Sequence, residues 1–140
     1  MADDLRQCVE HGQKYGVLIG IQNHADALTT SDQVLQIIKR VDSPWFGAIV
    51  DTGFFPGPDP YAHIARVLPH AVNWQIKEKV DTKDGTQRTD MRRLVRLIRD
   101  GGYRGYLPIE TLSSAGQEND PRARVAELHA ELRAALAEMA

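Results

Sequence analysis

Cysteine is almost absent from this sequence, because Cys8 is the only one among 140 residues. A single thiol excludes an internal disulfide framework and fits a reducing compartment. Long apolar runs are also missing, and no stretch approaches the roughly 20 apolar residues of a membrane span. The first twelve residues, MADDLRQCVEHG, are acidic and amphipathic, which is not the pattern of a signal peptide. These absences predict a cytoplasmic protein that does not enter the membrane.

The sequence also lacks an excess of charge of either sign, with 17 Lys and Arg against 19 Asp and Glu. No basic field therefore favours nucleic acid or an anionic membrane surface, and the expected partner is a small molecule or another protein. What is present is enough apolar material for a core, since 42% of the residues are hydrophobic. We expect one domain over residues 1–140.

Apolar residues recur at helical spacing in five segments and form short continuous runs in four others. Thr30 or Ser31 is expected to cap the second helix and Thr89 the fourth. Helices are predicted at about 5–15, 31–41, 60–68, 90–100 and 121–139, and strands at 17–21, 47–50, 71–76 and 106–109. One helix followed by four strand-helix units indicates an α/β protein with parallel strands.

Four such units form either an open sheet or half of an eight-unit barrel. The segment IQNHADA after the first strand has no G-x-G-x-x-G, so a dinucleotide-binding sheet loses its main support and the barrel is favoured. The polar segment KEKVDTKDGTQ contains Asp84-Gly85 and predicts a mobile loop, in the manner of a lid. Trp74 alternates with Gln75 and is expected to point into the helix layer.

Polar side chains lie where every predicted strand stops: Gln22, Asn23 and His24, then Asp51, then Gln75, Lys77 and Glu78, and finally Glu110. In parallel α/β folds the carboxyl ends of the strands share one rim, where ligands bind. Two carboxylates and two amide oxygens there would suit Mg or Mn. The alternatives are that the carboxylates cap turns or pair with Lys77 and Arg104, and that the glutamines lock neighbouring loops.

Four ordered motifs carry a family resemblance: GVLIGIQNH, VDSPWFGAIVDTGFF, VNWQIKE and GYRGYLPIET. They resemble the last four strands of the xylose isomerase-like TIM barrels, the superfamily of sugar isomerases, sugar epimerases and endonuclease IV-like proteins. The resemblance covers roughly residues 3 to 112 and implies a parallel (β/α)4 half of a TIM barrel, here preceded by one helix. The fold would be the C-terminal half of a longer barrel.

The resemblance implies a divalent metal site at Gln22, Asp51, Gln75 and Glu110, of which only Asp51 and Glu110 keep the residue type of the family. Gln22 and Gln75 stand where Glu and His are expected. With a formal ligand charge of about −2 instead of about −3, Mn or Mg is expected to bind weakly or not at all. Phe54 stands where a His is common and Glu78 stands for an Asp, and these two with Asn23 and Lys77 are expected to bind substrate.

The implied reaction is proton transfer on the carbon next to a sugar carbonyl, assisted by the metal. Gln22 cannot take a proton, so Glu110 is the expected base. His24 is a candidate second base, because residues two apart on a strand point to the same side. Lys77 as a Schiff-base lysine is a less favoured alternative to its pairing with a neighbour such as Glu78.

Two hypotheses follow. The first is a sugar or sugar phosphate isomerase or epimerase with a partly degenerate metal site, in which catalysis by this chain is uncertain. The second is a non-catalytic sugar-binding or interaction half-barrel. Because half a barrel leaves unpaired strand edges, we expect a homodimer or association with a missing N-terminal half-barrel.

Overall fold

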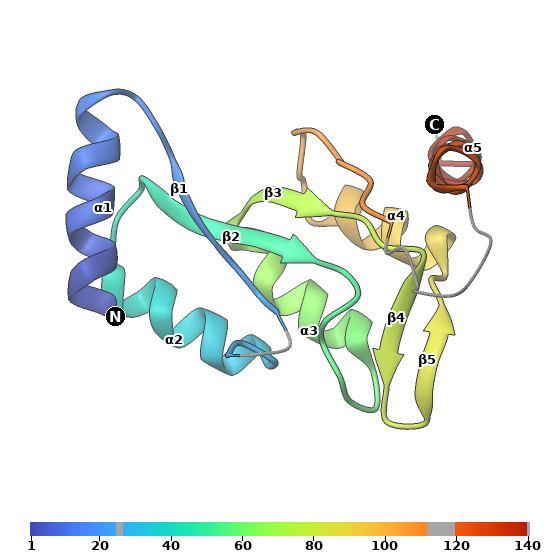
Figure 1. Ribbon diagram of the computed structural model, residues 1–140, viewed down its shortest axis with the longest axis horizontal. Coiled ribbons are helices and arrows are strands. Elements are labelled where there is room, and N and C mark those ends of the chain that lie inside the picture. Colours follow the sequence, from blue (N-terminus) through green and yellow to red (C-terminus); the bar gives the residue numbers. More distant parts are fainter. Residues whose placement is uncertain (25–26, 112–119, 140) are drawn as a thin grey trace.

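The computed structural model describes residues 1–24, 27–111 and 120–139, and it contains a parallel sheet lined by helices (Figure 1). Among these residues, no helix has the length and apolar character needed to cross a membrane. The elements in chain order are α1 (Ala2–Lys14), β1 (Ile19–Gln22), α2 (Ser31–Val41), β2 (Phe46–Asp51), α3 (Pro60–Val67), the 3₁₀ helix η1 (Leu68–His70), β3 (Ala71–Gln75), β4 (Lys79–Thr82), β5 (Gly85–Arg88), α4 (Met91–Asp100) and α5 (Pro121–Ala137). All five predicted helices and the first three predicted strands are confirmed.

The three strands lie in the order β1-β2-β3 and are parallel. Gln22 at the end of β1 pairs with Ile49 of β2, and Asp51 at the end of β2 pairs with Gln75 at the end of β3. The strands therefore finish close together and present their last side chains along one edge. We call this edge, together with residue Glu110, the carboxyl rim.

Helix caps fix where the chain turns back after each strand. Thr30 caps α2 through a capping box in which its side chain and that of Gln33 each bond the other's backbone. Asp59 caps α3 ahead of Pro60, which suits the first turn because it has no N–H to satisfy. The cap of α4 is Asp90, one residue after the predicted Thr89, whose hydroxyl is used elsewhere.

The core lies between the sheet and the helices, with α2 and α3 packed against β2. Val34, Val50, Ile64 and Trp74 are fully buried there. The ring of Trp74 meets the ring of Tyr103 edge-on at 5.7 Å, on the face of β3 opposite the rim residue Gln75. The prediction that Trp74 points into the helix layer is therefore confirmed.

Two predicted segments differ in the structure. The fourth strand is reduced to a single parallel bridge between Ile76 and Ile109, because Pro108 has no N–H to donate and Tyr106 is 89% exposed. The loop predicted at KEKVDTKDGTQ is instead the antiparallel hairpin β4-β5, closed by the turn Lys83-Asp84 and by Gly85 at φ +107°. The hairpin stands beside the carboxyl end of the sheet (Figure 1).

Candidate functional site

The carboxyl rim brings the four predicted metal positions together. Gln22, Asp51 and Gln75 are the last residues of β1, β2 and β3. Two backbone hydrogen bonds bring Glu110 to them. Ile76 N donates to Pro108 O at 2.8 Å, and Glu110 N donates to Ile76 O at 3.0 Å. The sequence thus predicted the convergence of these residues correctly in space, whereas their role as metal ligands stays a prediction.

Gln22 presents its amide nitrogen, not its oxygen, to the other rim residues. Its Nε2 donates to Asp51 Oδ2 at 3.0 Å and to Gln75 Oε1 at 2.5 Å. This orientation is required, because an ionised carboxylate only accepts hydrogen bonds. The glutamines therefore lock neighbouring strand ends together, which is one of the alternatives raised by the sequence.

Asp51 is completely buried and uses both of its oxygens. Oδ1 accepts from Gly53 N at 2.9 Å, which closes a tight turn after β2, while Oδ2 faces Gln22 and Lys77. Burial raises the pKa of the Asp51 carboxyl, and the Gly53 N–H, the Lys77 charge and the Gln22 amide oppose that rise. The sequence left open whether Asp51 closes a turn or lines the site. In the structure the same side chain closes the turn and faces Lys77 at the rim.

Lys77 holds the two rim carboxylates. Its Nζ lies 2.8 Å from Glu110 Oε2 and 3.4 Å from Asp51 Oδ2, and only 5% of its side chain is exposed. Asp51 is unexposed, whereas the Glu110 side chain is 43% exposed and reaches solvent. The described contacts therefore do not pair Lys77 with its sequence neighbour Glu78. The pairing partners are carboxylates from two other strand ends.

Two buried threonines, which the sequence did not single out for this role, fix the backbone of Lys77. Thr52 Oγ1 accepts from Lys77 N at 2.8 Å, and Thr89 Oγ1 donates to Lys77 O at 2.7 Å. A Cβ on Gly53 would lie 3.0 Å from Lys77 Cγ, so the lysine stem passes directly over this glycine. The hydrogen bonds to its backbone and the contact of its stem with Gly53 thus fix where the Lys77 ammonium lies.

Asn23 is 1% exposed and is bonded to backbone. Its Oδ1 accepts from Asp51 N at 2.9 Å, and its Nδ2 donates to Asp51 O at 2.8 Å and to Phe54 O at 3.2 Å. These contacts hold the turn that carries Asp51. The described geometry makes Asn23 a positioning residue, and its predicted contact with substrate stays a prediction.

A cavity of about 280 Å³ opens beside the rim, just below the roughly 300 Å³ at which typical small-molecule pockets begin. Three residues that the sequence predicted to bind substrate line this cavity, namely Phe54, Lys77 and Glu78. Glu110, the predicted base, lines it as well. Its lining residues are Gly53, Phe54, Lys77, Glu78, Lys79, Asp81, Thr86 and Glu110. Lys79, Asp81 and Thr86 belong to the β4-β5 hairpin, so the segment predicted as a lid forms one wall.

Aromatic contacts extend the site toward β1. The ring of Phe54 lies 5.7 Å from Lys77 Nζ and 4.3 Å from the ring of His24. His24 is exposed and is not among the residues that line the cavity. The structure therefore places His24 near the site, and its role as a second base stays a prediction.

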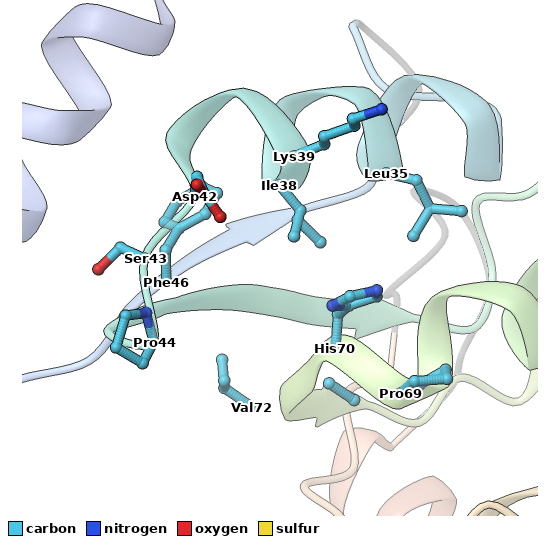
Figure 2. Close-up of a pocket in the computed structure, with 11 residues that line it drawn as sticks. Leu35, Ile38, Lys39, Asp42, Ser43, Pro44, Phe46, Pro69, His70 and Val72 are labelled. Carbon is cyan, nitrogen blue, oxygen red and sulfur yellow. The ribbon is translucent and has the colours of Figure 1, made fainter.

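A larger hollow of about 680 Å³ lies at the opposite, amino-terminal end of the strands (Figure 2). Leu35 and Ile38 point into it from α2, and His70 faces them from η1. The amino-terminal face of a barrel sheet serves stability, whereas the carboxyl-terminal face carries chemistry. We therefore take the smaller cavity at the rim as the candidate site.

The rim as it stands does not fit a divalent metal ion. Such an ion needs oxygen ligands at about 2.0–2.6 Å, but Gln22 offers N–H groups and the Lys77 ammonium occupies the space between the carboxylates. Within residues 1–24, 27–111 and 120–139, no group of three or more His, Cys, Asp or Glu side chains is arranged to hold a metal. No chemical step is therefore assigned to a metal here.

The fold is shared with solved structures. A xylose isomerase domain protein from Planctomyces limnophilus has 19% identity and a TM-score of 0.72, and the match covers 98% of this chain and 52% of the other. The apo 3-keto-D-glucoside 4-epimerase from E. coli has 18% identity and a TM-score of 0.71, covering 95% and 52%. A xylose isomerase-like TIM barrel protein from Mycobacterium smegmatis in complex with magnesium has 22% identity and a TM-score of 0.68, covering 94% and 50%.

The chain spans about half the length of these structures, as expected for a half-barrel. No curated protein sequence matches it significantly. The family model of the xylose isomerase-like TIM barrel, however, matches residues 1–135, which is nearly the whole chain. The chain therefore belongs to the xylose isomerase-like TIM barrel family.

Proposed function

We propose that the chain is half of a sugar isomerase or epimerase barrel in which Glu110 moves a proton at the carbon next to a sugar carbonyl. The observation that carries the proposal is the ion pair of Glu110 with Lys77 at the wall of the rim cavity. Glu110 is partly exposed there, so a ligand can reach it. Membership of the family and the 3-keto-D-glucoside 4-epimerase among the similar structures support a sugar as the ligand.

In this proposal Glu110 takes the proton from the carbon, and the electrons of the C–H bond form a carbon–carbon double bond while the carbonyl oxygen becomes negative. The Lys77 ammonium stabilises that oxygen, because it is fixed in advance in a site largely shielded from water. Isomerisation is completed when the proton of the neighbouring hydroxyl passes to the negative oxygen, the hydroxyl oxygen becomes the new carbonyl oxygen, and Glu110 returns its proton to the former carbonyl carbon. One base suffices for this reaction, whereas an epimerisation needs a second group, for which His24 is the candidate.

Mn or Mg, predicted from the sequence, has no step in this proposal, because Lys77 already supplies positive charge at the rim. The remaining surfaces of a sugar or sugar phosphate site would come from a second half-barrel, either another copy of this chain or a separate N-terminal half. The whole chain, residues 1–140, acts in this proposal as one half-barrel domain. Phe54 and Glu78 would contact the ligand from within it.

The test is exchange of the substrate C–H proton for deuterium in D₂O, followed by NMR with a panel of ketoses and their phosphates. We expect exchange with at least one sugar, reduced by about 100-fold or more in Glu110→Gln, which keeps the shape but cannot take a proton. Glu127→Gln on the exposed face of α5 is the matched control and should exchange like the wild type. Exchange that survives in Glu110→Gln would contradict the role of Glu110.

A second candidate is a non-catalytic sugar-binding half-barrel. The observation that favours it is the closed set of bonds among Gln22, Asp51 and Gln75, which engages groups that would otherwise meet a ligand. Saturable binding of a sugar, without proton exchange for any member of the panel, would select this candidate over the first.

A further inference from the structure

We propose that Lys77 is a built-in cation that takes the place of a divalent metal at the rim, and that removing it creates a Mn site from Asp51, Glu110 and the glutamines. The inference goes beyond the proposed function, because it concerns which cation balances the rim and holds with or without turnover. It depends on the contacts of Lys77 and on the orientation of Gln22.

The ammonium group and a divalent ion would need the same oxygens. Lys77 Nζ is 2.8 Å from Glu110 Oε2 and 3.4 Å from Asp51 Oδ2. A metal bonded to both oxygens would lie within contact distance of the ammonium and be repelled by it. The two cations therefore exclude each other.

Lys77 is placed for this role by its surroundings. Thr52 and Thr89 hold its N–H and its carbonyl oxygen, and its stem lies over Gly53. Phe54 covers one side of the ammonium at 5.7 Å. With 5% of its side chain exposed, Lys77 has little access to water as an alternative partner. The carboxylates are the partners that make its burial tolerable.

The orientation of Gln22 is a second observation that points the same way. Its amide N–H groups face Asp51 and Gln75, so they already engage two of the oxygens that a metal would need. A metal site would require the Gln22 amide to turn by half a rotation and offer its oxygen. That turn is disfavoured while the Asp51 carboxylate accepts the N–H, and it becomes favourable only when a metal takes over the carboxylate.

Replacing Lys77 removes the only charge that the described contacts set against these two carboxylates. Lys77→Ala also opens space, whereas Lys77→Met removes the charge and keeps most of the stem. Both variants leave two carboxylates around the position that the ammonium vacates, with the amides of Gln22 and Gln75 next to Asp51, and carboxylate and amide oxygens are donors that suit Mn. Lys77→Arg keeps the positive charge and is the matched control.

The experiment is calorimetric titration of Mn into the purified full chain, with circular dichroism to verify folding. We expect no saturable binding to the wild type or to Lys77→Arg. We expect saturable binding to Lys77→Ala or Lys77→Met, at least about tenfold tighter than the weakest binding that the titration detects, and we expect it to be lost again when Asp51→Ala is added.

Saturable Mn binding by the wild type that disappears in Asp51→Ala would overturn the proposal, and so would folded Lys77 variants that gain no binding. If neither neutral variant folds, the wild-type titration with its Asp51→Ala control still decides. None of these readouts depends on sugar turnover, so failure here is distinct from failure of the proposed function.

Discussion

Asp51 shows how one buried side chain combines structural and chemical work. Its carboxyl closes the turn at Gly53 and contacts Lys77, yet burial raises its pKa above the value in an unfolded chain. Ionising this group therefore costs stability, a cost that is absent below the unfolded value near 3.8 and develops as the pH rises through the folded pKa. Asparagine mimics the protonated form and carries no such cost.

We predict that Asp51→Asn becomes more stable relative to the wild type as the pH rises from about 4 to about 7. Urea denaturation at several pH values measures the difference in the free energy of unfolding. A difference that falls with rising pH would mean that the ion pair with Lys77 outweighs burial.

Asn23 provides a stability prediction at the same scale. Asn23→Ala removes three bonds to the backbone around Asp51 and leaves buried groups unsatisfied, so we expect a loss of about 2–4 kcal/mol in the free energy of unfolding. Asn73→Ala, at an exposed position of β3, is the control and should cost no more than about 0.5 kcal/mol. Equal losses in the two variants would contradict the positioning role.

At the scale of elements, the ends of β2 and β3 are joined by a hydroxyl group. Thr52 Oγ1 accepts from Lys77 N and donates to Gln75 O at 3.3 Å. We predict that Thr52→Val, similar in shape but without these bonds, costs about 1–3 kcal/mol in the free energy of unfolding and speeds hydrogen exchange at the Lys77 amide. Thr86→Val on exposed β5 is the control, and an unchanged Lys77 exchange rate in Thr52→Val would refute the link.

Elements with an apolar face were predictable from the sequence, and the hairpin was not. Helical spacing and short apolar runs located α1 to α5 and the three strands of the sheet because those elements bury one side. All four residues of β5 are exposed, so its sequence has no apolar alternation. The Asp84-Gly85 pair was the available signal for a hairpin turn.

The convergence at the rim was predictable from strand ends, whereas the central ion pair was not. Sequence proximity suggested Glu78 as a partner for Lys77, although adjacent residues of an extended chain point to opposite sides. The actual partner Asp51 lies far away in sequence and comes close through the pairing of Asp51 with Gln75. Such a contact depends on register, which single-residue patterns do not encode.

At the scale of the whole molecule, several large apolar side chains next to the sheet are exposed and do not belong to the core. Leu18 and Val17 before β1 are each 51% exposed, and Tyr106 is 89% exposed. Leu18 and Tyr106 both border a hollow of about 400 Å³ over Gly20 and Ile49. Exposed apolar patches of this kind are typical of surfaces that associate.

We predict that the chain self-associates in solution through this face and that Leu18→Lys shifts it toward the monomer. Light scattering coupled to size-exclusion chromatography measures the mass, with Leu136→Lys, an exposed position on α5, as the control. A wild-type monomer at all concentrations tested would contradict self-association and leave a separate half-barrel as the expected partner.

We propose that an ammonium group, not a divalent ion, holds the two carboxylates of the rim. The most direct measurement is anomalous diffraction from crystals of the wild-type protein grown with Mn. We expect Lys77 Nζ between Asp51 and Glu110 and no manganese peak at the rim. A manganese ion bound to both carboxylates, with Lys77 displaced, would contradict it.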